Sequence, residues 1–376
     1  MKKVAIVRGS NLNKWEMQNY EPLMDRFDIT AYSTAGPHYD ISKIKIPIVQ
    51  LPSHPEHPDT YMPGLEDHLA DKDIVFTADI SWMYSSQAIV AKEKYGCKVI
   101  CLEWENIPFV YEDIPVVRRI KEIVSVSADY FIAVTERARE ALILEGVSDE
   151  LIDVIPMGID LIKFRPDCFA GKEYRNKLGF KEDELVVLYV GRMVWEKGIY
   201  DFINSAANIF MDRNMANIPV RFLMIGSGPE MSNVKNRVAS WGLSDRISFL
   251  ESVSYDEMPH IHNLADIFVL PSIPTRTWQE QFGLVLIESM ACGKPVIASL
   301  TGSISEVISD CGILVQPNDP LSLSGAVKKL LLDRELRESL GRAAINRVNR
   351  NYDSNNIAQR IGAVFEKVSA ASLVSI

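Results

Sequence analysis

Two cations follow an apolar run near the middle of the chain. Arg192 and Lys197 belong to the segment Gly191-Arg-Met-Val-Trp-Glu-Lys-Gly198, directly after Leu185–Val190. A planar guanidinium fork and an ammonium point charge together suit a diphosphate, and Gly191 would let a ligand approach the backbone. A solvated basic turn explains the same residues equally well, so the spacing by itself leaves both interpretations open.

Two glycine-containing turns also follow apolar runs, at Gly226-Ser-Gly228-Pro229 and at Thr301-Gly302-Ser303. Backbone N–H groups at the start of the next helix would bind an anion there, and Pro229 is expected at the first helical position. Plain strand-to-helix connections and helix caps are the alternatives. Because Met231 occupies the third glycine position of a dinucleotide fingerprint, a dehydrogenase is not indicated.

Two acids flank a tight turn in the next segment. Glu280 precedes Phe282-Gly283, which predicts a turn that opens an apolar helix to about Cys292, and Glu288 lies on that helix. The two acids are eight residues apart, and if the whole segment were helical the rise between them would be about 12 Å. Glycosidase carboxylates lie only about 5–9 Å apart. We therefore expect the two acids to hold separate parts of one extended ligand; two acids without a shared role are the alternative.

Other residue sets have the side chains that bind metals, but their spacing is unfavourable. Asp71-Lys-Asp73 precedes an expected strand and so lies at the wrong end of a sheet. His260 and His262 are two residues apart on a helical pattern and would not face one ligand. His54 and His57 stand in a proline-rich loop. We expect no resident metal and no cofactor.

Short apolar runs alternate with helical patterns along nearly the whole chain. Such runs are typical of parallel strands that helices cover on both faces. The expected strands are Val4–Val7, Ile74–Ala78, Lys98–Leu102, Tyr130–Val134, Leu151–Ile155, Leu185–Val190, Val220–Ile225, Ile247–Leu250, Ile267–Leu270, Pro295–Ala298 and Ile313–Val315. This is an α/β fold of two parallel-sheet domains, whose strand ends we expect to face a central cleft.

The expected domains are residues 1–160, residues 161–352 and a final helix in residues 353–376. The first boundary follows from the prolines and glycine of Pro156–Pro166, and the last from the break at Asn351–Asp353. The chain has 376 residues, 47% hydrophobic and 24% charged, with a formal charge of −10. This composition argues against disorder, against a membrane-spanning helix and against a nucleic-acid binder.

The cysteines and the first residues indicate a cytoplasmic protein. Five scattered cysteines, an odd number without zinc spacing, are typical of reduced thiols. The apolar stretch before Arg8 is too short for a signal peptide. A helical pattern over Val116–Val124 alternates apolar and basic residues, which is compatible with weak contact to an acidic membrane surface. A solvated helix face is the alternative, and the sequence does not indicate the oligomeric state.

The order of these motifs resembles retaining glycosyltransferase family 4. The similar elements are Gly191-Arg192 … Lys197-Gly198, Gly226-x-Gly228-Pro229, Glu280-x-Phe282-Gly283 … Glu288, and Gly302 … Glu306, of which the Glu-x7-Glu element is highly specific. The resemblance is firm over about residues 128–315 and weak over the first hundred. It implies the GT-B fold, two Rossmann-like domains with the last helix crossing back to the first.

The resemblance also implies a role for each matching residue. Arg192 and Lys197 would neutralise the diphosphate of a nucleotide sugar, Glu280 would bind donor-sugar hydroxyls, and Glu288 would hold the ribose hydroxyls. The remaining residues would lie beside sugar and phosphates: Gly191, Gly226, Gly228, Phe282, Gly283, Leu284 and Gly302. The reaction would be a metal-independent, retaining transfer of a hexose to an acceptor hydroxyl.

Three positions depart from the family pattern. Glu103 takes the place of a histidine that relatives carry near the reacting carbon, and we include it among the candidate catalytic residues. Arg8-Gly9-Ser10 replaces a Gly-Gly loop, where Gly9 would still admit phosphates or acceptor, and Ser303 replaces the second glycine near Glu306. Because the histidine is missing, a non-catalytic nucleotide-sugar binder is one alternative function. A nucleotide-sugar epimerase on a similar double fold is the other.

Overall fold

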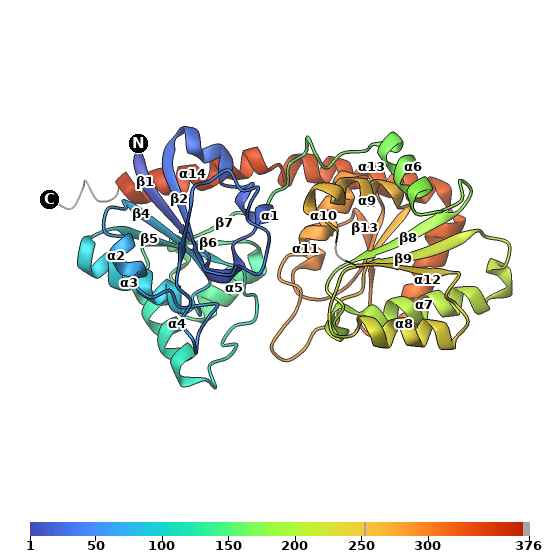
Figure 1. Ribbon diagram of the computed structural model, residues 1–376, viewed down its shortest axis with the longest axis horizontal. Helices are drawn as coiled ribbons and strands as arrows, with labels where there is room; N and C mark the ends of the chain where they lie inside the picture. The colour runs from blue at the N-terminus through green and yellow to red at the C-terminus, as the bar shows by residue number, and fades with distance from the viewer. Residues whose placement is uncertain (252, 371–376) are drawn as a thin grey trace. The chain divides into compact units, whose positions relative to one another are not determined.

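The protein is described by a computed structural model that covers residues 1–251 and 253–370 (Figure 1). The chain divides into two compact units. Unit 1 comprises Met1–Ile159 together with the segment that begins at Tyr352, and unit 2 comprises Asp160–Asn351. Each unit is a parallel β-sheet with helices on both faces. The predicted α/β fold with two Rossmann-like sheets is confirmed.

Unit 1 contains a seven-stranded parallel sheet in the order β3-β2-β1-β4-β5-β6-β7. Its strands are β1 (Lys2–Val7), β2 (Phe27–Thr34), β3 (Ile48–Leu51), β4 (Ile74–Ala78), β5 (Lys98–Glu103), β6 (Tyr130–Ala133) and β7 (Ile152–Val154). Its helices are α1 (Lys14–Met17), α2 (Leu65–His68), α3 (Met83–Tyr95), α4 (Pro115–Ser127), α5 (Glu136–Leu144) and α14 (Ser354–Ala370). The order reverses once, between β1 and β4.

Alternate residues of the central strands supply two core layers in unit 1. Ala5 and Val7 are buried in one cluster with residues of α2, α3, α4 and α5, so these helices cover one face. Val4 and Ile6 are also fully buried and lie on the other face, because successive strand residues point in opposite directions. Burial on both faces explains why β1 is a continuous apolar run.

The last helix covers the second face of this sheet. Phe365 of α14 is fully buried and makes edge-to-face contacts with Phe27 and Phe76, at centroid distances of 5.5 and 5.3 Å. An ion pair of 2.6 Å joins Arg26 to Glu366. The helix therefore belongs to unit 1, as the resemblance implied, although its nearest sequence neighbours belong to unit 2.

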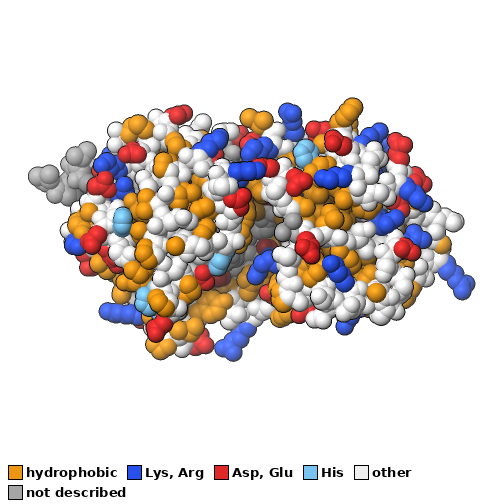
Figure 2. Space-filling view, in the orientation of Figure 1, with side chains coloured by type: hydrophobic (Ala, Val, Ile, Leu, Met, Phe, Trp, Pro, Cys, Tyr) orange, Lys and Arg blue, Asp and Glu red, His pale blue; other side chains and the backbone are white. Residues whose placement is uncertain are grey.

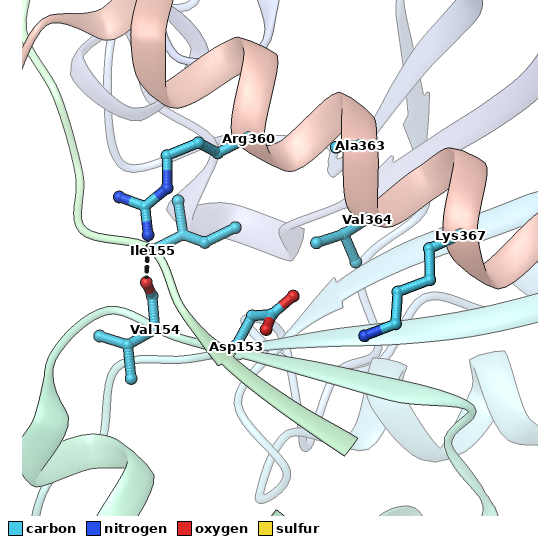
Figure 3. Close-up of a pocket in the computed structure, with 7 residues that line it drawn as sticks. All are labelled: Asp153, Val154, Ile155, Arg360, Ala363, Val364 and Lys367. Carbon is cyan, nitrogen blue, oxygen red and sulfur yellow. Dashed lines mark hydrogen bonds between the residues drawn. The ribbon is translucent and has the colours of Figure 1, made fainter. Parts of the chain in front are cut away.

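A pocket of about 300 Å³ lies between α14 and the edge strand β7 (Figure 3). Arg360 donates a hydrogen bond of 2.5 Å to the carbonyl of Val154. Lys367, on the same helix, donates to the hydroxyl of Tyr130. Both cations therefore have partners within unit 1, and their hydrogen bonds hold α14 against the sheet.

Unit 2 contains a six-stranded parallel sheet in the order β10-β9-β8-β11-β12-β13. Its strands are β8 (Leu185–Val190), β9 (Val220–Ile225), β10 (Ile247–Leu250), β11 (Ile267–Leu270), β12 (Val296–Ser299) and β13 (Gly312–Val315). Its helices are α6 (Cys168–Lys177), α7 (Ile199–Met211), α8 (Met231–Ser240), α9 (Met258–Leu264), α10 (Leu284–Ala291), α11 (Ile304–Ile308), α12 (Pro320–Leu332) and α13 (Arg334–Asn351). Its order also reverses once, between β8 and β11.

Two groups of helices cover this second sheet. Val187 and Tyr189 of β8 pack in one buried cluster with residues of α7, α8 and α12. Helices α6, α9, α10 and α13 contact one another and lie on the other side of the sheet in Figure 1. Both sheets are thus doubly wound, and ligands of such sheets bind beyond the carboxyl ends of the strands at the point where the order reverses.

The sequence analysis missed two strands, β2 and β3. β2 carries Asp28 and four hydroxyl residues, so it does not form an apolar run, yet Ser33 and Thr34 are fully buried. The hydroxyl of Ser33 donates a hydrogen bond of 2.9 Å to the carbonyl of Gly9. β3 is an edge strand with one buried residue among four. The other eleven strands are present where predicted, to within two residues at each end.

Candidate active site

The polar turns of unit 2 lie at the carboxyl ends of its strands. Figure 2 shows charged side chains of both signs on the surface of the molecule. The Arg192–Lys197 turn follows β8, and the loop from Pro271 to Gly283 follows β11. β8 and β11 are hydrogen-bonded neighbours, in which Val187 pairs with Ile267 and Leu188 pairs with Phe268. These loops therefore flank the reversal of strand order, where the doubly wound fold places its ligands.

Lys197 and Glu280 meet at this position. The Lys197 Nζ lies 2.8 Å from Glu280 Oε2 and 3.1 Å from Oε1, and both side chains are largely buried, 16% and 9% exposed. Ser272, fully buried, donates 2.7 Å to the same Oε2. The Trp278 ring lies 4.6 Å from the Lys197 ammonium, a cation–π contact. The predicted phosphate cation and sugar-binding acid thus form one cluster.

Gly302 holds the backbone of Glu280 in place. A Cβ at Gly302 would lie 1.9 Å from the Glu280 carbonyl oxygen, and its φ is +53°. The next residue, Ser303, donates its N–H to that same carbonyl at 2.9 Å. Only glycine allows this approach, so the turn after β12 fixes the loop that carries Glu280.

Arg192 stands in the same turn after β8 as Lys197 and has an exposed side chain. Its carbonyl accepts a hydrogen bond of 2.9 Å from the hydroxyl of Tyr189. Burial, and then the charge of Glu280, raise the pKa of Tyr189, so this hydroxyl remains a neutral donor. Within residues 1–251 and 253–370 the Arg192 guanidinium has no ion pair or hydrogen bond, and Gly191 directly precedes it.

The glycines at the end of β9 contact the Arg192 turn. A Cβ at Gly226 would lie 1.9 Å from the Gly191 carbonyl oxygen, and one at Gly228 would lie 2.5 Å from that of Met193. α8 begins at Met231 with Glu230 as its N-cap, so the prediction that Pro229 takes the first helical position is wrong. An acid at the cap disfavours an anion there. These glycines therefore pack one loop against the other.

Phe282, Gly283 and Leu284 form the turn into α10, as predicted. Gly283 is the N-cap, with φ +83°, and Leu284 is the first helical residue, while Phe282 is buried. Glu288 lies on α10 and is only 5% exposed. Its Oε2 is 3.3 Å from Nε2 of His262 on α9, a fully buried ring.

His262, Ser272 and Trp278 are the contacts that the sequence analysis did not assign. Ser272 follows the end of β11 by two residues, and Trp278 precedes Glu280 by two, so their proximity to the site was visible as sequence neighbourhood. His262 is 26 residues from Glu288 and was considered only as a metal ligand. The packing of α9 on α10, which brings the two together, has no signature in the sequence.

Glu103 ends β5 in unit 1, and its loop is joined to the loop of Asp79 at the end of β4. Glu103 Oε2 accepts from the Ile80 N–H at 3.0 Å, and Asp79 Oδ1 accepts from the Trp104 N–H at 2.8 Å. Each acid thus binds the backbone that follows the other. Burial, and then the charge of Asp79, raise the pKa of Glu103 well above its usual range.

The cation in the turn after β1, Arg8, binds groups within unit 1. Arg8 is 1% exposed, donates 2.6 Å to Glu16 and also donates to the carbonyls of Val7 and Phe76. Gly9 has φ +55°, and a Cβ there would lie 2.4 Å from the carbonyl of Asp59. Gly9 is therefore required by the loop of Asp59, and Arg8 is a structural ion.

The metal and membrane candidates also have structural positions. Asp71 pairs with Lys3 and Lys72, and within the described part of the chain no group of three or more His, Cys, Asp or Glu side chains is arranged for a metal. In α4, Lys121 is buried against Glu145 at 2.7 Å, which removes it from the expected basic face. None of the described helices is long and apolar enough to cross a membrane.

The sequence of unit 2 matches a known family. Residues 171–347 match the model described as glycosyl transferases group 1. The chain is 28% identical over 312 residues to a D-inositol 3-phosphate glycosyltransferase of Acidothermus cellulolyticus, across 77% of this chain and 68% of that protein. A protein of the same name from Nocardia farcinica is 32% identical over 242 residues, 61% of this chain and 51% of that one. The matches therefore span about half to two thirds of these relatives.

Solved structures share the whole fold. HepE of Anabaena, determined in complex with UDP and glucose, has a TM-score of 0.82 at 19% identity, covering 98% of this chain and 100% of its own. Sucrose-phosphate synthase of Thermosynechococcus elongatus has a TM-score of 0.80 at 21% identity, covering 99% and 100%. The chain therefore has the GT-B fold that the resemblance implied, and residues 171–347, in unit 2, are similar in sequence to the glycosyl transferases group 1.

Proposed function

We propose that this protein transfers a hexose from a nucleotide-diphosphate sugar to an acceptor hydroxyl, with retention at the anomeric carbon and without a metal. The observation that carries the proposal is the Lys197–Glu280 cluster at the reversal of strand order in unit 2. It combines a cation for phosphate and an acid for sugar hydroxyls, at the ends of β8 and β11. The match of unit 2 to the glycosyl transferases group 1 supports this assignment.

In this proposal Lys197 and Glu280 belong to one donor site. Each charge compensates the other, which avoids two unpaired ions in a largely buried position. When a donor binds, its diphosphate takes the ammonium of Lys197 and the exposed guanidinium of Arg192. Its sugar hydroxyls take the carboxylate of Glu280, which Ser272 continues to hold.

The cations supply the catalytic charge. Negative charge develops on the departing diphosphate as the glycosidic bond breaks, and Arg192 and Lys197 stabilise it where it forms. The sugar becomes oxocarbenium-like, and the acceptor attacks from the face that the diphosphate leaves. A phosphate oxygen takes the acceptor proton, so no protein nucleophile is needed. Glu288 holds the ribose, and the backbone at Phe282, Gly283 and Leu284 lies beside sugar and phosphates.

The first experiment is a panel of nucleotide sugars with and without EDTA, followed by thermal shift and by release of nucleoside diphosphate. UDP-glucose enters first, because HepE was solved in complex with it. Inositol 3-phosphate enters as one acceptor, from the printed name of the relatives. A donor that stabilises the protein and turns over equally with EDTA supports the proposal. The anomer of the first product, read by NMR, tests retention.

The panel also separates the two alternatives. Glu103 is buried and accepts a hydrogen bond from the Ile80 N–H, at the position where relatives carry a histidine. This favours the non-catalytic binder as the second candidate function. It predicts a donor that stabilises the protein but never turns over, even with acceptor extracts. An epimerase would change the donor sugar without any acceptor. Stabilisation by none of the donors would remove the diphosphate role of Arg192 and Lys197.

The central prediction concerns Lys197→Met. Because the lost cation stabilises the leaving diphosphate, kcat should fall about 10²–10³-fold. The variant should also lose about 1–3 kcal/mol of stability, since the Glu280 carboxylate is left without its partner. The double variant Lys197→Met with Glu280→Gln removes both charges and should recover stability but not activity. Full activity in the single variant would contradict the phosphate role.

A further inference from the structure

Unit 2 has a cavity at the end of the sheet opposite the cluster of Lys197 and Glu280. It encloses about 330 Å³ between α6 and the loops that precede β11 and β12. Asp266 directly precedes β11, and Lys294 precedes β12 by one residue more. Because the strands are parallel, these residues lie at the amino ends of the sheet, opposite the turns of the candidate active site. The volume is sufficient for a small organic molecule.

The charged groups in this cavity are unevenly paired. Arg175 binds Asp266 at 2.5 Å and also donates to the carbonyls of Leu264 and Glu184. Asp266 additionally accepts from the Val186 N–H at 2.7 Å. Lys172 faces Glu182 at 3.6 Å, with both side chains mostly exposed. Two of the three cations that line the cavity therefore have a carboxylate.

Lys294 is the cation without a carboxylate. Its Nζ donates 3.0 Å to the carbonyl of Asn263, and no carboxylate of the described residues lies within ion-pair distance of it. Burial lowers the pKa of this ammonium. The charge of Asp266 attracts this ammonium from beyond ion-pair distance and offsets part of the effect of burial. A buried cation whose hydrogen-bond partner is a carbonyl is still costly, and an anion in the cavity would reduce that cost.

We propose that this cavity binds a small organic monocarboxylate, with the carboxylate on Lys294 and the apolar body against Phe180. The lining charges decide the ligand class. Three cations and two carboxylates sum to +1, so a monoanion neutralises the cavity, whereas a dianionic phosphate would leave it negative. Phe180 lines the cavity and is 6% exposed, which provides an apolar wall for the body of the ligand. This site is independent of the sugar-transfer proposal.

Cys168 is a built-in reporter of occupancy. It is the first residue of α6 and lines the cavity. Its thiol is exposed, whereas Cys97, Cys101, Cys292 and Cys311 are buried. A reagent such as iodoacetamide should therefore modify Cys168 first, and a molecule in the cavity should slow that reaction.

The test measures the rate of Cys168 alkylation in the full chain by mass spectrometry, at constant ionic strength. The probe is benzoate, with benzamide as its neutral isostere and inorganic phosphate as a control that is mostly the dianion at an assay pH of about 8. Benzoate should slow alkylation at least fivefold with saturation, and benzamide and phosphate should not. Lys294→Met should abolish protection, and Lys294→Arg should keep part of it. The double variant Lys172→Met with Glu182→Gln removes the exposed ion pair, leaves the lining charge at +1 and should keep all of the protection.

Each other result overturns the proposal. An alkylation rate that benzoate does not change removes the site. Equal protection by benzamide shows an apolar pocket without charge recognition, and protection by phosphate alone shows the wrong ligand class. Protection that survives in Lys294→Met removes the assigned cation. Thermal unfolding of each variant verifies folding, and the comparison of benzoate with benzamide in the unaltered protein stands even if Lys294→Met fails to fold.

Discussion

At the scale of residues, the charged groups of this protein separate into paired structural ions and candidate chemical groups. Arg8, predicted only as part of a loop, is fully buried and bound to Glu16. Arg192 is exposed and lacks such a partner within the described ranges. The type of residue was visible in the sequence, but its availability was not, because burial and pairing are set by side chains distant in the chain.

Glu103→Gln tests the buried acid of unit 1. Because burial raises the pKa of Glu103, the folded state holds this proton more tightly than the unfolded chain does. The stability contribution is complete below the unfolded pKa, about 4.5, and is lost as pH rises through the folded pKa. The glutamine does not ionise, so the variant should gain stability relative to the wild type as pH rises from 5 to 8.

Urea unfolding at a series of pH values measures this difference. The matched control is Glu122→Gln on α4, whose side chain is 56% exposed and which reports the effect of removing a surface carboxyl. A stability difference between wild type and Glu103→Gln that stays constant from pH 5 to 8 would show that Glu103 is ionised throughout.

At the scale of elements, the site depends on turns that press loops together at the strand ends. Gly302 after β12 supports the carbonyl of Glu280 after β11, and Gly226 after β9 supports Gly191 after β8. The sequence analysis predicted these glycines as ligand contacts. The structure shows them in contact with backbone carbonyls, since neighbouring strands must bring their loops to one point.

Gly302→Ala should reduce both stability and activity. A φ of +53° costs an alanine about 1–2 kcal/mol. The new Cβ would also lie 1.9 Å from the Glu280 carbonyl oxygen, so that carbonyl would have to move. Gly325→Ala is the matched control, because Gly325 lies within α12 with nothing near its added Cβ. That change should stabilise by about 0.5–1 kcal/mol and leave turnover unchanged. Thermal unfolding and donor turnover decide both, and an active, fully stable Gly302→Ala would contradict this account of the loop.

At the scale of the whole molecule, the chain closes unit 1 with its last helix. α14 follows the sequence of unit 2 but supplies Phe365 to the core of unit 1. Unit 1 is therefore discontinuous in sequence and is complete only when residues beyond Tyr352 have folded onto it.

Phe365→Ala should destabilise unit 1 selectively. Loss of a buried phenylalanine costs about 3–5 kcal/mol, and the substitution removes the ring that packs edge-to-face on Phe27 and Phe76. Hydrogen exchange should accelerate in β1 and β4 and stay unchanged in β8 and β11. The control Phe169→Ala alters an 84% exposed ring on α6 and should change neither set. Equal acceleration in both sheets would show that the units unfold as one.

The sequence by itself determined the two parallel sheets, the positions of eleven strands and the loops that carry the candidate site, because buried parallel strands are continuous apolar runs. It also carried the resemblance, which lies in short segments after strands. It did not reveal β2, which carries polar residues such as the buried Ser33 and Thr34, or β3, an edge strand with one buried residue among four. The tertiary structure alone decided that Lys197 pairs with Glu280, that His262 lies against Glu288 and that no carboxylate of the described residues pairs with Lys294. The first two contacts join residues that are 83 and 26 positions apart in the sequence. The third depends on which carboxylates are already paired with other cations. Such contacts are set by tertiary packing, which no local sequence pattern predicts.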